Sequence, residues 1–297
     1  LVFCWKTPPP VVDYSKQYLT FEALEDGTFT FSTNALQYSL DDGITWETLA
    51  ASTATPTITA GSKILWKQTG LTPDSGYGIG TFSSTGNFNV SGNIMSLYYG
   101  DDFKGQKDLT EKISAFCELF IFCNKLVSAE NLILPATTLA QSCYYFMFAG
   151  CASLTKAPEL PATTLADYCY YNMFQGCTSL IKAPELPATT LANNCYNSMF
   201  YGCTSLTTAP ELLATTLVDV CYANMFAECT SLTTAPELHA TTLAYNCYFS
   251  MLYNCTSLSY LDIYSNEEIG YEIFNNATNS GKLVLHGQTS LASQDSF

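Results

Sequence analysis

The chain contains no arginine, the residue that most often anchors phosphate groups in nucleic-acid-binding proteins. Its 11 basic side chains are all lysines and stand against 26 acidic side chains, so the formal net charge is −15. A chain this acidic repels nucleic acids and anionic membrane surfaces, and we expect neither as a partner. Charged residues amount to only 12% of the sequence, which leaves a largely neutral polar surface suited to extracellular contacts.

Long apolar segments and histidines are scarce as well. The nearest candidate for a spanning segment, AFCELFIFC at 115–123, is much shorter than the roughly 18 residues that a transmembrane helix needs. We interpret it as part of a core and expect no transmembrane segment. The 297 residues are enough for two domains, each with its own apolar interior.

Residues 18–104 are predicted to form an antiparallel β-sandwich. Short runs rich in aromatic and β-branched residues alternate at period two and end at turn residues, as in YLTFEAL at 18–24 and SKILWK at 62–67. Before them, three consecutive prolines in KTPPPVVDYS at 6–15 favour an extended conformation, so residues 1–17 are expected to form a Pro-rich arm. The glycines of GYGIGTFSSTG at 76–86 fit neither nucleotide-binding fingerprint, and we expect a hairpin loop there.

The stretch SLDDGITW at 39–46 fits the pattern S-x-D-x-G-x-T-W. Asp41 is expected to accept backbone hydrogen bonds, Gly43 to adopt a positive φ, and Trp46 to pack under the hairpin. The stretch resembles the Asp-box hairpins of sialidases and other secreted β proteins. Because a sialidase carries several such boxes and a catalytic set of arginines, one box without arginine indicates a structural hairpin and no catalysis.

A fixed period of 26 residues dominates the second half of the chain. One full unit is LPATTLADYCYYNMFQGCTSLIKAPE at 160–185, and an irregular earlier copy holds Cys117 and Cys123. After Cys255 the pattern decays, so that Ile273 and Gly281 stand where cysteines would fall. We expect the repeats and a terminal cap to occupy residues 105–287, and a polar tail to occupy 288–297.

Each unit is interpreted as a strand, a turn and a short helix. Leu180, Ala183 and Leu186 fit a short strand that ends at Pro187, and the spacing over 195–200 suits a helical or 3-10 turn. These three parts in 26 residues predict a leucine-rich-repeat coil.

The units resemble the BspA-like leucine-rich repeats of bacterial surface proteins over residues 110–260. Leu186-Pro187 is similar to the Ile-Pro step of that family, Met199-Phe200 to its helical Ala-Phe pair, and Cys203 and Leu206 to its last conserved positions. The present units are longer, with Cys195 at an apolar or Gly position and Met in place of Ala. The resemblance implies a curved solenoid on a cell surface, with adhesion as the role.

The paired cysteines of the units raise four alternatives: metal ligands, disulfides, redox groups and packing. The spacing C-x₇-C and the two histidines, His239 and His286, do not suit zinc, so no metal or cofactor is expected. Residues eight apart on a helix lie about 12 Å apart, too far for a disulfide unless the helix breaks after Phe174. Helices of neighbouring units pack roughly 8–10 Å apart. We therefore expect reduced, stacked core thiols at Cys143, Cys151, Cys169, Cys177, Cys195, Cys203, Cys221, Cys229, Cys247 and Cys255.

Two further columns recur with the same period. Glu159, Glu185, Glu211 and Glu237 are interpreted as solvated charge rather than a cation site. The tyrosine column is interpreted as a core ladder rather than a sugar platform, and it consists of Tyr144, Tyr170, Tyr196, Tyr222 and Tyr248.

Positions that differ between units are the better candidates for a contact surface, because packing constrains the recurring positions. The candidate binding residues are Tyr168, Tyr171, Asn193, Asn194, Asn197, Asp219, Tyr245, Asn246 and Phe249, accompanied by Asp167, Val220 and Ala223.

No set of residues combines a nucleophile, a base and an oxyanion-binding group, so we expect no enzyme. The leading hypothesis is a secreted or cell-surface binding and adhesion protein in which the solenoid presents a face to a protein or glycan partner. The alternative is a structural or receptor-binding component of a phage virion or another extracellular assembly. A signal peptide upstream of Leu1 would favour the first hypothesis. A glycan-processing enzyme, suggested by the Asp-box alone, would require measurable turnover of glycosides.

Overall fold

The computed structural model describes residues 12–68, 70–71, 78–263, 273 and 282–285. Cys4, most of the Pro-rich arm, most of the expected cap, Gly281 and the tail lie outside this range. The elements in chain order are η1 (Tyr14–Lys16), β1 (Leu19–Ala23), β2 (Phe29–Phe31), β3 (Leu36–Ser39), β4 (Glu47–Leu49), β5 (Lys63–Lys67), β6 (Phe82–Ser84), β7 (Phe88–Asn93), α1 (Ser96–Tyr99), η2 (Gly100–Phe103), β8 (Leu126–Ile133), β9 (Tyr260–Ile263) and β10 (Lys282–Leu285).

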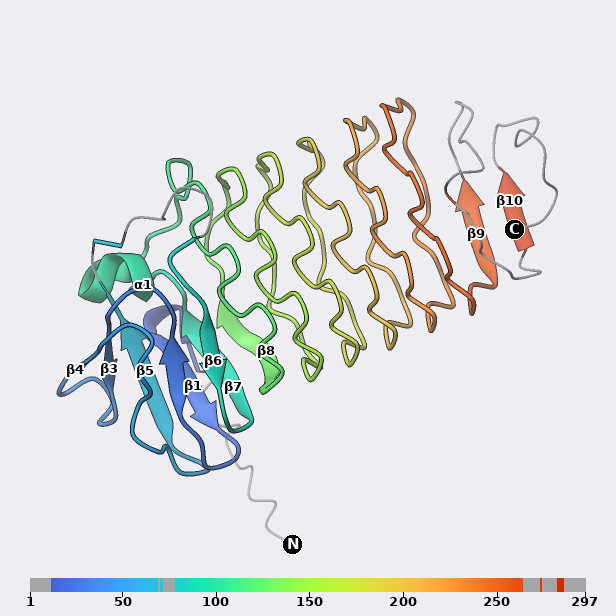
Figure 1. The fold of residues 1–297 in the computed structure, drawn as a ribbon. Coiled ribbons are helices and arrows are strands. Elements are labelled where there is room, and N and C mark those ends of the chain that lie inside the picture. Colours follow the sequence, from blue (N-terminus) through green and yellow to red (C-terminus); the bar gives the residue numbers. More distant parts are fainter. Residues whose placement is uncertain (1–11, 69, 72–77, 264–272, 274–281, 286–297) are drawn as a thin grey trace, which may run out of the picture.

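The N-terminal region is mostly β and is built on a six-stranded sheet with the order β4-β3-β5-β1-β7-β8. Neighbouring strands pair antiparallel except for β7 and β8, which are parallel. Strand β8 lies beyond residue 104, where the sequence placed the end of the first domain. The sheet therefore runs directly into the repeat region (Figure 1).

A second sheet of two strands, β2 and β6, packs on β1 of the large sheet. The ring of Phe21 in β1 lies 5.2 Å from that of Phe29 and 4.8 Å from that of Phe82, measured between centroids. Phe82 in turn stacks on Phe120 at 5.7 Å, and Phe120 stacks on Phe148 at 5.5 Å. One chain of aromatic contacts thus links the core of the sheets to the interior of the repeats.

The repeat region consists of 26-residue units that follow one another in a row from β8 to β9 (Figure 1). In the units between β8 and β9, the strand expected in each unit is reduced to a single bridging residue. Lys156 pairs with Lys182, Lys182 with Thr208, and Thr208 with Thr234, all in parallel. Prolines at 158, 184 and 210 follow shortly after and lack the N–H that would extend the pairing.

The prediction of a helical or 3-10 turn over 195–200 is wrong, because this segment forms consecutive turns and neither kind of helix. Alternate residues donate their N–H to the carbonyl three positions back, as Cys195 does to Ala192. The residues between them donate to the following unit, as Tyr196 does to the carbonyl of Cys221 at 3.1 Å. We call this stretch of each unit, 193–203 in the present example, the turn ladder.

The turn ladder repeats every four residues. Asn194, Ser198 and Gly202 have φ of 56°, 54° and 70°, so the third residue of every second turn is left-handed. Cys195 and Met199 consequently both point inward and are fully buried. A period of four lies close to the 3.6 of an α-helix, which explains why the sequence pattern favoured a helix.

Successive units lie closer together than packed helices do. The rings of the tyrosine column stack at 5.7–5.9 Å with interplanar angles of 3–10°, and a parallel phenylalanine column, with Phe148, Phe174, Phe200 and Phe226, stacks at 5.4–5.7 Å. The expectation that neighbouring units pack roughly 8–10 Å apart, as helices do, is therefore wrong. Backbone hydrogen bonds, rather than helix packing, set the distance between units.

Candidate binding surfaces

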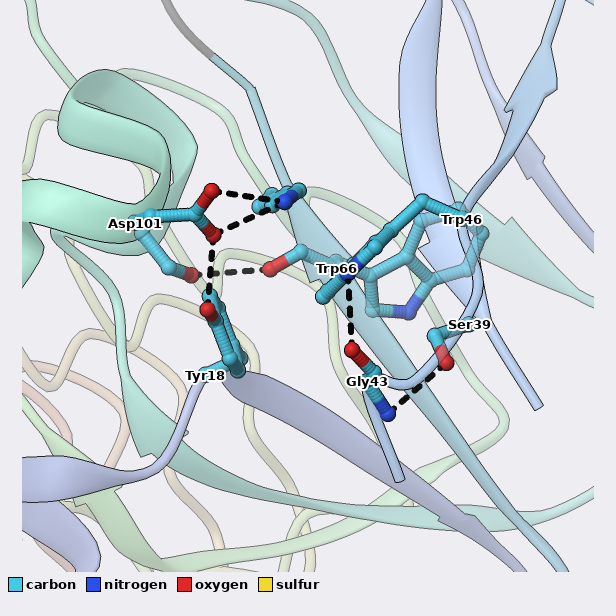
Figure 2. A network of polar contacts seen from close by, with 8 residues as sticks. Tyr18, Ser39, Gly43, Trp46, Trp66 and Asp101 are labelled. Carbon is cyan, nitrogen blue, oxygen red and sulfur yellow. Dashed lines mark hydrogen bonds and ion pairs between the residues drawn. The ribbon is translucent and has the colours of Figure 1, made fainter. Parts of the chain in front are cut away.

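The hairpin between β3 and β4 has the geometry that the sequence predicted, and Figure 2 shows its residues Ser39, Gly43 and Trp46. Asp41 accepts from the Thr45 backbone N–H at 2.9 Å and from the Thr45 hydroxyl at 2.6 Å. The Gly43 N–H donates to the Ser39 hydroxyl at 2.9 Å, and Gly43 has a φ of 88°. The Trp46 indole N–H donates to the Gly43 carbonyl at 3.1 Å, which closes the hairpin. The hydrogen bond from the Thr45 side chain, with the others, lowers the pKa of Asp41 to about 2.

The hairpin rests on a polar network that joins it to η2 (Figure 2). The ammonium group of Lys67 lies 4.1 Å from the centroid of the Trp46 ring and donates to both carboxylate oxygens of Asp101, at 2.7 and 3.0 Å. The Tyr18 hydroxyl donates to Asp101 at 2.7 Å. Burial, followed by this hydrogen bond, raises the pKa of Tyr18 to about 12. Each of these groups is engaged by another, so the network holds the hairpin in place and offers no reactive group.

The twelve cysteines that the structure describes are buried thiols. The first cysteine column, which comprises Cys143, Cys169, Cys195, Cys221 and Cys247, lies beside the tyrosine column. Among the described residues, the S–H of Cys195 donates to no acceptor, although backbone hydrogen bonds at Ala192, Tyr196 and Cys195 reach its sulfur. The redox state of these cysteines in solution stays a prediction.

The second cysteine column differs from the first in its hydrogen bonding. Each of its thiols donates to the carbonyl oxygen of a phenylalanine in the preceding unit, at 2.9–3.2 Å. The column consists of Cys151, Cys177, Cys203, Cys229 and Cys255. Burial raises the pKa of Cys203 and Cys255 to about 12, so these thiols stay protonated and unreactive at neutral pH.

The candidate binding residues do not form one patch. Tyr245, Phe249 and Tyr168 are exposed by 71%, 38% and 36%, while Asn197 is only 8% exposed. The amide of Asn197 donates to Asn194 at 3.0 Å and accepts from the Ser198 hydroxyl at 2.8 Å, so it is engaged within the chain, and its contact with a partner stays a prediction.

The other candidates divide into exposed and half-buried positions. Asn193 and Asp219 are exposed, whereas Tyr171, Asn194 and Asn246 are half-buried. The Asp219 carboxylate accepts from the backbone N–H of Tyr245 at 3.1 Å and so links two units. Three units separate the pair Tyr168 and Tyr171 from the pair Tyr245 and Phe249.

Four aromatic side chains gather on the turn ladder near the β region. Tyr145 stacks on Tyr171 at 5.0 Å and contacts Phe146 at 4.5 Å, while Phe146 and Tyr168 lie 5.8 Å from Tyr171. We call Tyr145, Phe146, Tyr168 and Tyr171 the aromatic patch. Tyr145 and Phe146 are not among the variable positions predicted from the sequence, which begin at Asp167. The signal was present in the unit at 141–151: Tyr145 precedes Tyr171 by one period of 26 residues, so the two side chains meet in neighbouring units.

A groove runs along a different stretch of the units, the one that contains the Ala-Pro-Glu-Leu motif. Three adjoining hollows of 660, 360 and 250 Å³ share lining residues, so they form one depression across four units. We call it the proline groove; prolines at 158, 161, 184, 187 and 210 line it, together with Glu159, Glu185 and Glu211. Three of the four glutamates that the sequence indicated as solvated charge, Glu159, Glu185 and Glu211, therefore line a hollow of the surface.

Comparisons with family models, curated proteins and solved structures find no match to this chain. Among the described residues, no helix has the length and apolarity to cross a bilayer. Within the same part of the chain, no group of three or more His, Cys, Asp or Glu side chains is arranged to hold a metal ion.

Proposed function

We propose that this chain is a non-enzymatic binding and adhesion protein, located on a cell surface or outside the cell. Its repeats form a solenoid of the kind that the BspA-like resemblance implies, and the aromatic patch contacts a protein or glycan partner. The observation that carries the proposal is the patch itself, four aromatic rings in mutual contact on a surface segment.

Two features of the patch support binding. Equivalent positions in later units hold Asn197 and Ala223, with their turn ladder intact, so the fold does not require an aromatic residue there. Aromatic side chains are enriched at protein interfaces, and their flat faces also pack against sugar rings. The backbone beneath is fixed by bonds between units, such as that from Phe146 N–H to the Tyr171 carbonyl at 3.0 Å. The rings are therefore held in place before a partner arrives, which reduces the entropic cost of binding.

The test is binding of the full chain to a glycan array and to extracellular proteins immobilised for pulldown. Tyr168→Ala and Tyr171→Ala should each weaken capture about tenfold or more, as expected for aromatic residues central to an interface. Tyr245→Ala is the matched control, because Tyr245 is an exposed aromatic on the same ladder three units away, and it should leave capture unchanged. Equal losses in all three variants would place the contact elsewhere, and turnover of any glycoside would overturn the non-enzymatic assignment.

A further inference from the structure

We propose that the proline groove binds an extended, basic peptide segment of a partner protein. This site is separate from the aromatic patch, and the two proposals can fail independently. The groove crosses four units along 130–135, 155–161, 181–187 and 208–213, whereas the patch lies on the turn ladder.

Charge selects the occupant of the groove. Among the described residues, Glu159, Glu185 and Glu211 form no ion pair, while Glu130 at the groove's end pairs with Lys156 at 2.6 Å. Towards the C-terminal side, Thr208 stands where earlier units have Lys156 and Lys182, so the acidic character is not offset there. The whole chain carries a net charge of −15. A second copy of the chain or an acidic polymer would be repelled, and a cationic partner would be attracted.

Spacing selects an extended chain. Successive glutamates belong to successive units. The centroids of equivalent rings in successive units lie 5.4–5.9 Å apart, and this distance sets the step from one glutamate to the next. Alternate residues of an extended peptide point to the same side and lie about 6.6 Å apart. Three lysines at alternate positions can therefore face Glu159, Glu185 and Glu211 one by one, and the flexible side chains absorb the small difference in step.

The walls of the groove add apolar contact. Ile181 and Leu213 are 57% and 45% exposed although they line the hollows, and the neighbouring prolines present further apolar surface. In the described structure, the backbones of Glu185 and Leu186 make no hydrogen bond within the chain. Their N–H and C=O groups can bond to a peptide lying across them.

The experiment measures binding of a labelled peptide to the full chain by fluorescence anisotropy at two salt concentrations. The probe alternates lysine and valine, with four lysines, and its control has the same composition with all lysines consecutive. We expect the alternating peptide to bind more tightly, and its affinity to fall as salt rises. Glu185→Gln and Glu211→Gln should each weaken it about threefold, in line with an exposed ion pair. Ile181→Ser should weaken it as well.

Glu111→Gln provides the matched control, since Glu111 is an exposed carboxylate outside the groove. It should leave the affinity unchanged. The proposal is overturned if the clustered peptide binds equally well or if Glu111→Gln matches the groove variants, because diffuse attraction would then suffice. Self-association of the chain that Glu185→Gln abolishes would also overturn it, since a second copy would be the occupant.

Discussion

Replacing a cysteine by serine should have very different effects in the two cysteine columns. Cys195 and Cys203 belong to the same unit and are both fully buried. The thiol of Cys203 donates to the Phe174 carbonyl at 3.1 Å, whereas the described structure offers the S–H of Cys195 no acceptor, and its sulfur only accepts from the backbone. A serine at 203 inherits that acceptor, and a serine at 195 buries a hydroxyl whose proton has no acceptor.

The difference can be estimated from the contacts. A buried hydroxyl donor without an acceptor costs about 1–3 kcal/mol, so Cys195→Ser should lower the free energy of unfolding by roughly 1–2 kcal/mol more than Cys203→Ser. Alanine removes the sulfur at either position and should cost about 1–2 kcal/mol at both. The Phe174 carbonyl keeps its bond from the Cys177 N–H at 3.1 Å, so Cys203→Ala leaves no acceptor without a partner. Cys195→Asp should be far worse than either, because it buries a charge.

The assay is urea unfolding of the full chain under reducing conditions, followed by circular dichroism. With a slope of about 1–3 kcal/mol per molar urea, the two serine variants should differ in midpoint by roughly 0.5–1 M. The alanine variants control for lost volume. Serine variants with equal midpoints, or a less stable Cys203→Ser, would refute the distinction between the columns.

Three further outcomes are expected. The ten cysteines from Cys143 to Cys255 should react slowly with an alkylating reagent in the native protein, and nearly all of them should react after unfolding without reductant. Few titratable thiols in the unfolded protein would mean that they form disulfides, and stoichiometric zinc in the purified protein would mean that they are metal ligands. Val220→Asn should raise the free energy of unfolding by roughly 1 kcal/mol, because Val220 holds a φ of 59°, where Asn is tolerated. A lower urea midpoint in this variant would contradict the reasoning. Asp41→Asn should lower the midpoint at pH 7, and the gap to wild type should close as the pH falls from about 4 to about 2. The reason is that folding lowers the pKa of Asp41 to about 2. The stabilisation by its carboxylate is therefore present above the pKa of the unfolded state and is lost as the pH falls through the pKa of the folded state. A gap between the two midpoints that does not depend on pH would contradict this reasoning.

The sequence predicted the features that depend on local chemistry or on the period. The Asp-box hairpin has its expected bonds because the side chains of Ser39, Asp41 and Thr45 make them within seven residues. The tyrosine column is buried and stacked because a residue recurring every 26 positions meets its equivalent in the next unit. Both outcomes follow from the spacing alone.

The path of the backbone in each unit could not be predicted in this way. Residues four apart, such as Cys195 and Met199, lie on the same face of an α-helix and on the same face of the turn ladder. The burial of both side chains therefore fits either structure. The distinguishing signal was the residue directly before each cysteine. Asn194 and Gly202 occupy such positions, and both residue types tolerate a left-handed φ. Tyr168 and Val220 occupy the same position in other units and hide that signal.

The binding surfaces were harder to predict because they depend on which columns lie side by side. The proline groove is hollow because four short segments, one from each of four units, are held side by side at the spacing of the turn ladder. A recurring glutamate gives no indication of whether its surroundings are convex or concave. Asn197 was expected at the surface because it varies, but its amide is held by Asn194 and Ser198.

The close spacing of the units also bears on the acidic row. Side chains that recur with the period lie next to their own copies, which suits aromatic rings and thiols but sets like charges side by side. Two unit charges 6 Å apart repel by about 0.7 kcal/mol even in bulk water. Most recurring surface positions are accordingly neutral, as with the threonines at 163, 189 and 215, and the glutamates along the proline groove are the exception.

Glu185, between Glu159 and Glu211, should therefore destabilise the chain in the absence of a cation. Glu185→Gln removes a charge next to two like charges, and we expect it to raise the urea midpoint slightly at low salt and less at high salt. The same variant should weaken the basic peptide, so that stability and affinity change in opposite directions. Glu111→Gln should alter neither. If Glu185→Gln lowers the midpoint at low salt, the carboxylate stabilises the fold, and its place in the groove needs no cationic partner to explain it.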